Sequence, residues 1–261
     1  MHAAEREKRI LDLMRGSGFI AFQDLEQRVD ASPATLRRDL DRLEANGVIT
    51  RVRGGAHLNS AEPEPAPGDR PLGGVPFHEN IGRFPRQKAA IGRAAAALCR
   101  PGESVIIDGG STTLQMCPHL EPLGLNVLTN SLHIVSALMS QAGTRISVPA
   151  GSLFREQNIL LSPFEDDGMG RYRASKLFIG AAAIGEHGLM QSDVLLVQAE
   201  RRMLERTGEV IVLVDSSKFD APAGHVVCDL GDIDVLITDD AIKPHDQALL
   251  EKAGVKVLIA S

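Results

Sequence analysis

The stretch best suited to chemistry is SVIIDGGSTT, residues 104–113, where an apolar run meets an aspartate, two glycines and three hydroxyl residues. A buried strand that ends in such a loop can hold a small anion, because glycines let backbone N–H groups converge and hydroxyls add donors. An ordinary strand-to-helix turn has the same composition, so this stretch alone leaves both interpretations open. It is neither a P-loop nor a dinucleotide fingerprint, since no Gly-Lys-Ser/Thr follows and the third glycine is missing.

Three other strand-like runs also end in small polar residues: LTNS at 128–131, PAGS at 149–152 and VDSSKF at 214–219. If these strands are neighbours, their polar ends converge, and Lys218 can meet a phosphate as a point charge. Lys88 could face the same site from its helix. A solvated surface lysine is the alternative at both positions.

A second group of candidate residues lies on the helix expected at 33–46, with Ser32 as its N-cap. On a helical wheel its leucines cluster on one side, whereas Arg38 and Arg42 face the other and Arg37 lies at the edge. Outward guanidiniums can read guanine or grip phosphate in a major groove. A solvated amphipathic helix is the plainer interpretation, but the order of the surrounding elements favours DNA binding.

Those elements are a helix, a short helix, a turn, the helix at 33–46 and a strand pair turning at Gly54–Gly55, the order of a winged helix-turn-helix. Residues 60–71 contain four prolines and read as a linker. Beyond it, short Val/Ile/Leu-rich strands alternate with helices, which predicts an α/β domain with a mostly parallel, Rossmann-like sheet. We expect a DNA-binding domain over 1–58, a linker over 59–74 and a second domain over 75–261, with 152–174 as loop.

Composition narrows the class of protein further. Of 261 residues, 43% are hydrophobic and 24% charged, and no apolar run reaches the roughly 18 residues of a membrane span. The net charge of −6 is unevenly divided, with +1 on residues 1–57 (10 Lys/Arg, 9 Asp/Glu) and −7 on the rest (18 and 25). Three widely spaced cysteines indicate reduced thiols in a cytoplasm. We expect no membrane contact, metal or cofactor.

The stretches SPATLRRDL at 32–40 and RVRGGA at 51–56 resemble the helix-turn-helix and wing signature of the DeoR family of bacterial transcriptional regulators. The resemblance implies that the helix and wing meet double-stranded operator DNA. Asp39 is expected to orient an arginine rather than touch DNA. The candidate DNA-binding residues are Ser32, Thr35, Arg37, Arg38, Arg42, Arg51 and Arg53.

The second domain resembles the same family over nearly its whole length, through IDGGSTT, VLTNS, FIGAAAI, VLVDSSKF and VLITDD in that order. The resemblance implies a sensor domain similar in fold to ribose-5-phosphate isomerase and the CoA transferases, which binds a phosphorylated sugar effector. Where the family commonly has Gly-Gly after the third strand, Ala150 precedes Gly151, and its methyl group could narrow the pocket. The candidate effector-binding residues are Asp108, Gly109, Gly110, Ser111, Thr112, Thr113, Thr129, Asn130, Gly151 and Lys218.

Two functions compete at this point. The favoured one is a homodimeric or homotetrameric repressor of a sugar or sugar-acid catabolic operon, released from its operator by a phosphorylated sugar. The alternative is a sugar-phosphate isomerase-like enzyme with a DNA-binding head, which needs a carboxylate base near the sugar carbons. Asp108 is the candidate base, whereas Glu200 is expected to meet solvent or a neighbouring arginine. The eight scattered histidines supply no catalytic pair, so we expect no enzymatic activity.

Overall fold

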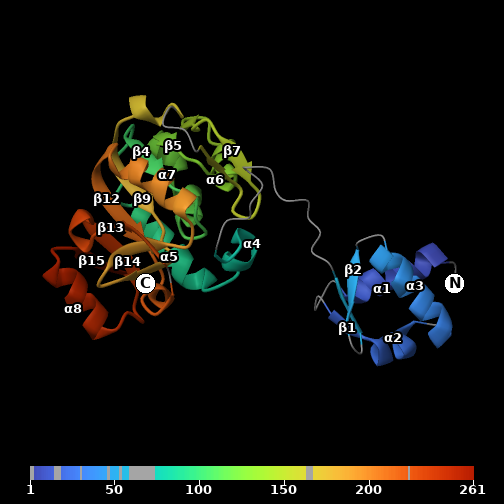
Figure 1. Ribbon diagram of the computed structural model, residues 1–261. Helices are drawn as coiled ribbons and strands as arrows, with labels where there is room; N and C mark the ends of the chain where they lie inside the picture. Colours follow the sequence, from blue (N-terminus) through green and yellow to red (C-terminus); the bar gives the residue numbers. More distant parts are fainter. Residues whose placement is uncertain are drawn as a thin grey trace. The chain divides into compact units, whose positions relative to one another are not determined.

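The computed structural model describes residues 3–14, 19–29, 31–45, 48–52, 55–58, 74–162, 167–222 and 224–261. The chain divides into two compact units, Met1–Pro67 and Gly68–Ser261 (Figure 1). Each unit has its own apolar core and is considered by itself below. Of the expected linker, only Gly74 belongs to the described residues.

The N-terminal unit packs three helices against a small antiparallel sheet with strand order β1-β3-β2. Its elements are α1 (Ala3–Met14), β1 (Phe19–Ala21), α2 (Phe22–Arg28), α3 (Pro33–Ala45), β2 (Ile49–Val52) and β3 (Gly55–Leu58). Leu36, Leu40 and Leu43 of α3 are buried, as their helical spacing predicts. Strand β1 is too short to show a period and was not expected from the sequence.

The C-terminal unit is built on a seven-stranded sheet, order β15-β14-β12-β9-β4-β5-β6, in which all pairs are parallel. Its strands are β4 (Ser104–Ile107), β5 (Asn126–Leu128), β6 (Arg145–Ser147), β9 (Ala174–Ile179), β12 (Thr207–Leu213), β14 (Val235–Asp239) and β15 (Lys256–Ala260). The helices are α4 (Phe77–Asn80), α5 (Pro85–Ala96), α6 (Leu132–Leu138), α7 (Val194–Leu204) and α8 (Pro244–Lys252).

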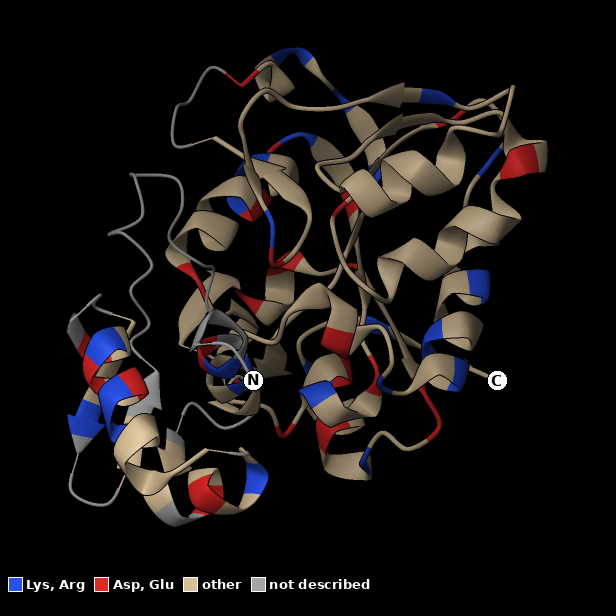
Figure 2. Cartoon of the chain, turned by 90° about the vertical axis from the view of Figure 1, so that its right-hand side faces the viewer, with Lys and Arg blue, Asp and Glu red and all other residues tan. Residues whose placement is uncertain are grey.

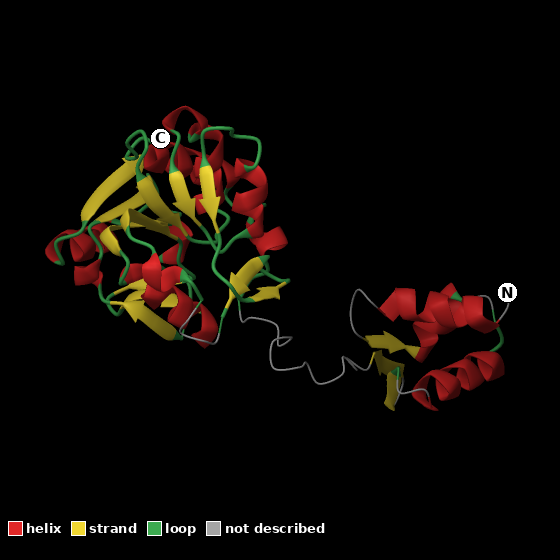
Figure 3. Ribbon diagram, turned by 90° about the horizontal axis from the view of Figure 1, so that it is seen from above, coloured by secondary structure: helices red, strands yellow, loops and turns green. Residues whose placement is uncertain are grey.

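Helices cover both faces of this sheet, as the apolar strands predict (Figure 3). Val105 and Ile107 of β4 join the core formed with α5 and α6, whereas Ile106 between them joins the core formed with α7 and α8. This alternation follows from the two-residue period of a strand. The sheet is therefore buried on both sides, and only its edges and strand ends are free to bind a ligand.

The segment after the glycine loop is helical although it contains Pro118, and it forms a 3-10 helix, η1 (Thr113–His119). The structure differs from the sequence prediction in two places. Residues 152–174 are not all loop, because β7 (Ser152–Phe154) and β8 (Ile159–Leu161) form an antiparallel hairpin. A separate antiparallel sheet was also missed, formed by β10 (Ala183–Gly185), β11 (Gly188–Gln191) and β13 (His225–Cys228).

Three further features of the described residues bear on membrane spans, thiols and metal sites. None of the helices in the described ranges is long and apolar enough to cross a bilayer. Cys99, Cys117 and Cys228 are all buried as free thiols, and burial raises the pKa of each to about 12. Within the same ranges, no cluster of three or more His, Cys, Asp or Glu side chains is arranged to hold a metal ion.

Candidate effector cavity and nucleic-acid interface

A cavity of about 500 Å³ opens at the carboxyl ends of β4, β9 and β12. Of the seven strands in this sheet, β4 comes first along the chain. Its neighbours are β5 on one side and β9 on the other, so the sheet extends from β4 in both directions. Such a reversal of strand order leaves a crevice beyond the strand ends, where open α/β sheets bind ligands. The topology thus places the cavity at the site where a ligand is expected.

Six of the ten predicted effector residues line this cavity: Asp108, Gly109, Gly110, Ser111, Thr112 and Lys218. The other four, Thr113, Thr129, Asn130 and Gly151, are not among the lining residues. For Thr129, Asn130 and Gly151 the reason is the strand order, because β5 and β6 lie on the side of β4 away from β9 and β12. Thr113 follows β4 itself and is completely buried at the start of the next helix. A Cβ at Gly151 would lie 2.5 Å from the Leu161 carbonyl oxygen, so this glycine permits close backbone packing. Ala150 does not line the cavity either, and its methyl group does not narrow it.

Asn130 supports the glycine loop from behind. Its side-chain oxygen accepts from the Gly109 N–H at 2.9 Å, and its Nδ2 donates to Asp108 Oδ1 at 3.1 Å. Thr113 Oγ1 donates to the Asp108 carbonyl at 2.7 Å and so ties the start of η1 to the end of β4. These buried side chains fix the loop before any ligand arrives, a contribution that sequence patterns could not separate from direct contact.

The carboxyl group of Asp108 is only 4% exposed at the cavity wall. Burial raises its pKa to about 6, while hydrogen bonds from Gly109 and Asn130 act in the opposite direction. Glu200, in the middle of α7, lines the same cavity and is 2% exposed. The expectation that Glu200 meets solvent or an arginine is therefore wrong, because the helix face that carries it packs against the sheet.

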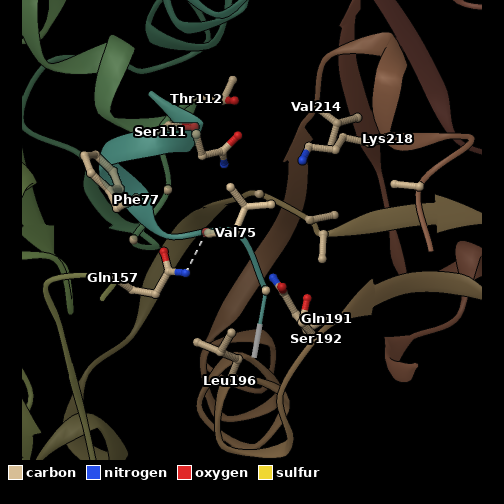
Figure 4. Close-up of a pocket in the computed structure, with 18 of the residues that line it drawn as sticks. Val75, Phe77, Ser111, Thr112, Gln157, Gln191, Ser192, Leu196, Val214 and Lys218 are labelled. Atoms are coloured by element: carbon tan, nitrogen blue, oxygen red, sulfur yellow. Dashed lines mark hydrogen bonds between the residues drawn. The ribbon is translucent and has the colours of Figure 1, made fainter. Parts of the chain in front are cut away.

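The basic side of the cavity is formed by Lys218, which follows β12, and Arg83, which precedes α5. In Figure 4 the Lys218 side chain reaches into the cavity, with Ser111 and Thr112 on the opposite side of the view. Lys88 does not line the cavity. Its ammonium is buried and donates to the Asn80 carbonyl and, at 3.2 Å, to Asn80 Oδ1. Burial lowers the Lys88 pKa to about 8.

Segment 74–84 forms a strap along the cavity that the sequence analysis missed. Its Val75 carbonyl accepts from Gln157 Nε2 at 3.0 Å, as Figure 4 shows. The Phe77 N–H donates to the Glu156 carbonyl at 3.0 Å, and the Phe77 ring stacks on His133 with 4.0 Å between centroids. The strap directly follows the proline-rich segment, so a ligand in the cavity touches residues next to the expected linker.

In the N-terminal unit, α3 is held by contacts at its start and on its inner face. Ser32 Oγ accepts from the Thr35 N–H at 3.3 Å and lies 2.8 Å from Thr35 Oγ1, as an N-cap does. Asp39 is buried and accepts from Arg6 Nε at 2.8 Å and Arg6 Nη2 at 3.1 Å. This contact orients an arginine of α1, in agreement with the role expected for Asp39.

The predicted DNA-binding arginines differ in their surroundings. The Arg37 guanidinium lies 5.2 Å from the centre of the Phe22 ring, Arg42 Nη1 lies 2.7 Å from Glu7 Oε1, and Arg51 pairs with Asp41. Arg38 is exposed and makes no ion pair or hydrogen bond within the described part of the chain. Figure 2 shows acidic segments interspersed with the basic ones on the helices of this unit. Arg53 lies outside the described residues.

A winged helix-turn-helix with an outward basic helix, joined to an α/β unit with a polar cavity, defines a transcriptional regulator with a sensor domain. Comparison with protein families gives the same division. Residues 6–62 match the DeoR-like helix-turn-helix domain, and residues 83–240 match the DeoR C-terminal sensor domain. The chain belongs to the DeoR family of helix-turn-helix transcriptional regulators.

Relatives support this membership along the whole chain. The HTH-type transcriptional regulator UlaR of Shigella dysenteriae serotype 1 is 31% identical over 258 residues, covering 99% of both chains. UlaR of Escherichia coli strain K12 / DH10B is also 31% identical with the same coverage.

Solved structures match only about half of the chain. Ribose 5-phosphate isomerase A of Methanocaldococcus jannaschii covers 51% of this chain and 53% of its own, with a TM-score of 0.36 and 18% identity. The eIF2B delta subunit of Chaetomium thermophilum covers 53% and 50%, with a TM-score of 0.40 and 19% identity. Likenesses at this level do not indicate a function.

Proposed function

We propose that this regulator is a cytoplasmic repressor of a sugar or sugar-acid catabolic operon, released from its operator when a phosphorylated sugar occupies the cavity. The observation that carries the proposal is the cavity itself, where the glycine loop, two hydroxyl side chains and Lys218 line a space next to the strap. Backbone N–H groups and a lysine are suited to a phosphate, and the remaining polar lining is suited to sugar hydroxyls. No cofactor or metal has a role in this mechanism.

The relatives and the sequence narrow the effector class. Within the family, the stretches PGESVII, ILLSP and LVQAERRML resemble the regulator of L-ascorbate utilisation. That resemblance favours a phosphorylated sugar acid among the candidates. The compounds tested as effectors should therefore include phosphorylated sugar acids as well as phosphorylated aldoses and ketoses.

Control of DNA binding requires that the effector favour one arrangement of the protein over another. The strap offers a route for this control, because residues 74–84 line the cavity and directly follow the linker. A ligand that packs against Val75, Phe77 and Arg83 changes the free energy of the strap's position. We infer that the protein acts as a homodimer or homotetramer, since two copies can grip the two halves of a palindromic operator.

The test is a titration of operator affinity against phosphorylated sugars and sugar acids, read by fluorescence anisotropy of labelled operator DNA. At least one compound should weaken operator binding, and its unphosphorylated form should not. Lys218→Met should abolish the response while leaving operator affinity without effector unchanged. Lys252→Met, at an exposed position at the end of α8, is the matched control and should respond like the wild type. If no phosphorylated sugar or sugar acid changes operator affinity, the proposal is wrong.

A second function, isomerisation of a sugar phosphate, is favoured by one observation: Asp108 and Glu200 both line the cavity, and the Asp108 pKa is about 6. A carboxylate with such a pKa can act as a base near neutral pH. Incubation of the protein with ribose 5-phosphate in deuterated water, followed by proton NMR, separates the two functions. A repressor should show no exchange at carbon 2. Exchange that Asp108→Asn abolishes would establish the enzyme instead.

A further inference from the structure

The lining of the effector cavity carries groups of opposite charge. Lys218 and Arg83 are cations, whereas Asp108 and Glu200 are carboxyl groups, with the Gln191 amide beside Glu200. Burial raises the pKa of both carboxyl groups, and the charge of Asp108 raises that of Glu200 further. No lysine or arginine is among the groups that act on either carboxyl. Two neighbouring buried carboxyls without a cation cannot both stay ionised easily.

Glu200 is only partly satisfied by the protein. Its Oε1 accepts from Gln191 Nε2 at 2.6 Å, a contact between α7 and β11. Its Oε2 is buried and has no hydrogen-bond partner among the described residues. Five such buried side-chain atoms occur in the described ranges, on Asp167, Glu200, Arg202, Arg206 and Thr238, and Glu200 alone of these residues lines the cavity.

A purely structural residue at this point would be apolar or fully hydrogen-bonded, because buried polar atoms in folded proteins nearly always have partners. The neighbouring inward-facing residues of α7, Val197 and Met203, are indeed apolar core residues. An unpartnered carboxyl oxygen beside a second carboxyl, in a cavity wall, is instead an arrangement that a ligand completes.

We propose that Glu200 determines effector specificity by donating a hydrogen bond to a sugar oxygen of the ligand, beside Asp108, which accepts one. This inference rests on the proposed function. A neutral carboxyl donates through its proton and a carboxylate only accepts, so the pair matches neighbouring acceptor and donor oxygens. The ligand class is therefore a phosphate ester that carries a vicinal diol or hydroxycarbonyl group.

The pH behaviour of Glu200 agrees with this geometry. Burial is the main cause that raises its pKa well above the ordinary value, and Asp108 raises it further. The titratable groups that act on it or respond to it are Asp108 at the end of β4 and Cys228 of β13. The neutral form of Glu200 is the one that can donate to a ligand.

The test compares two full-length variants that differ in donor capacity, Glu200→Gln and Glu200→Leu, with the wild type. Isothermal titration measures the Kd of inorganic phosphate, of ribose 5-phosphate, xylulose 5-phosphate and fructose 6-phosphate, and of 2-deoxyribose 5-phosphate and 1-deoxyxylulose 5-phosphate. In the wild type, at least one hydroxylated ester should bind about tenfold tighter than inorganic phosphate and than its deoxy analogue.

Glu200→Leu should remove most of this tenfold difference in Kd and leave the Kd of inorganic phosphate within about twofold, since Lys218 and the glycine loop are unchanged. Glu200→Gln should keep most of the difference, because its amide still accepts from Gln191 and still offers an N–H to the cavity. Melting temperatures of both variants check the fold, and Glu200→Leu should melt lower than Glu200→Gln, because it leaves the buried Gln191 amide without its acceptor.

Two outcomes would overturn the role of Glu200: an unchanged difference in Kd in Glu200→Leu, or a loss in Glu200→Gln as large as in Glu200→Leu. A wild type in which phosphate binds but no ester exceeds it would also overturn this inference while leaving the anion site intact. If neither inorganic phosphate nor any ester binds the wild type, the proposed function itself fails. The two failures are therefore distinguishable.

Discussion

The two binding regions use charged and polar side chains in opposite ways. In the DNA-binding unit the arginines of α3 and Arg51 of β2 are exposed or paired with carboxylates near the surface. In the sensor unit Asp108 and Asn130 are almost completely buried and hydrogen-bonded to each other, and Glu200 is buried with one carboxyl oxygen bonded to Gln191. Exposed ion pairs exchange partners at little cost, whereas a buried polar group depends on every partner it has. Substitutions in the DNA-binding region should therefore lower operator affinity with little loss of stability. Substitutions in the sensor region should lower stability with little loss of operator affinity.

The largest expected effect is in the buried region. Asn130→Leu leaves the Gly109 N–H and the Asp108 carboxyl without the partner they share, which should lower the free energy of unfolding by about 2–4 kcal/mol. Tyr172 is the single tyrosine in a chain without tryptophan, so its fluorescence in urea reports on this unit alone. Asn126→Leu, which removes a more exposed amide contact to Gly102, should cost less than about 1 kcal/mol. Equal losses of unfolding free energy in Asn130→Leu and Asn126→Leu would contradict the difference between buried and exposed polar contacts.

The next effect concerns operator affinity. Arg38→Ala should weaken operator binding by about 1–3 kcal/mol if Arg38 reads a base. The urea transition seen by Tyr172 and the affinity for the effector should not change. Arg86→Ala, at an exposed position on α5, serves as the control for loss of charge. An unchanged operator affinity in Arg38→Ala would refute the assignment of α3 to the groove.

The pH dependence of stability tests whether Asp108 is buried in the sensor unit. The Asp108 pKa is raised from 3.8 to about 6 on folding, so between these values the folded protein holds a proton that the unfolded chain lacks. Its contribution to stability is present at low pH and is lost as pH rises through about 6. The free energy of unfolding of the wild type, minus that of Asp108→Asn, should rise by about 1 kcal/mol from pH 7 to pH 5. A constant difference would show that Asp108 is not buried as described.

The smallest effect tests whether surface pairing restrains an arginine. Because Glu7 holds Arg42 at 2.7 Å, Arg42→Ala should cost less than about 1 kcal/mol of operator affinity, below the loss in Arg38→Ala. Glu7→Gln frees Arg42 and removes a negative charge, and should raise operator affinity about twofold at low salt. Anisotropy titrations at two salt concentrations measure both changes. If Arg42→Ala lowered operator affinity as much as Arg38→Ala, surface pairing with Glu7 would not restrain Arg42.

Local patterns predicted the elements of both units well. The stripe Leu36, Leu40 and Leu43, the Ser32 cap and the apolar strands all have short periods that the chain shows directly. The glycine loop after β4 was predicted for the same reason, because a strand followed by Asp-Gly-Gly and hydroxyls is continuous in sequence. The resemblance to the DeoR family then predicted the fold of both domains from these local motifs.

Which strand ends share the cavity could not be predicted, because strand order is a property of long-range pairing. The expectation grouped the ends of β4, β5, β6 and β12, whereas the cavity lies at β4, β9 and β12. Asn130 and Gly151 were therefore expected to contact the ligand directly, but they pack behind the loop or in the hairpin. Glu200 was misjudged because a glutamate in mid-helix usually faces water. The strap was missed because residues 75–84 were expected to belong to the second domain but contain no motif that indicates contact with a ligand.

The position of β4 in the middle of the sheet also affects how the protein is made. The three strands of the DNA-binding unit pair within residues 19–58, so this unit can fold soon after it leaves the ribosome. Strand β4 pairs with β9, which ends about 70 residues further along the chain, and such distant pairing is slow. A nascent chain therefore carries a finished DNA-binding head before its sensor exists, and a chain cut short in between could occupy operators without responding to any metabolite.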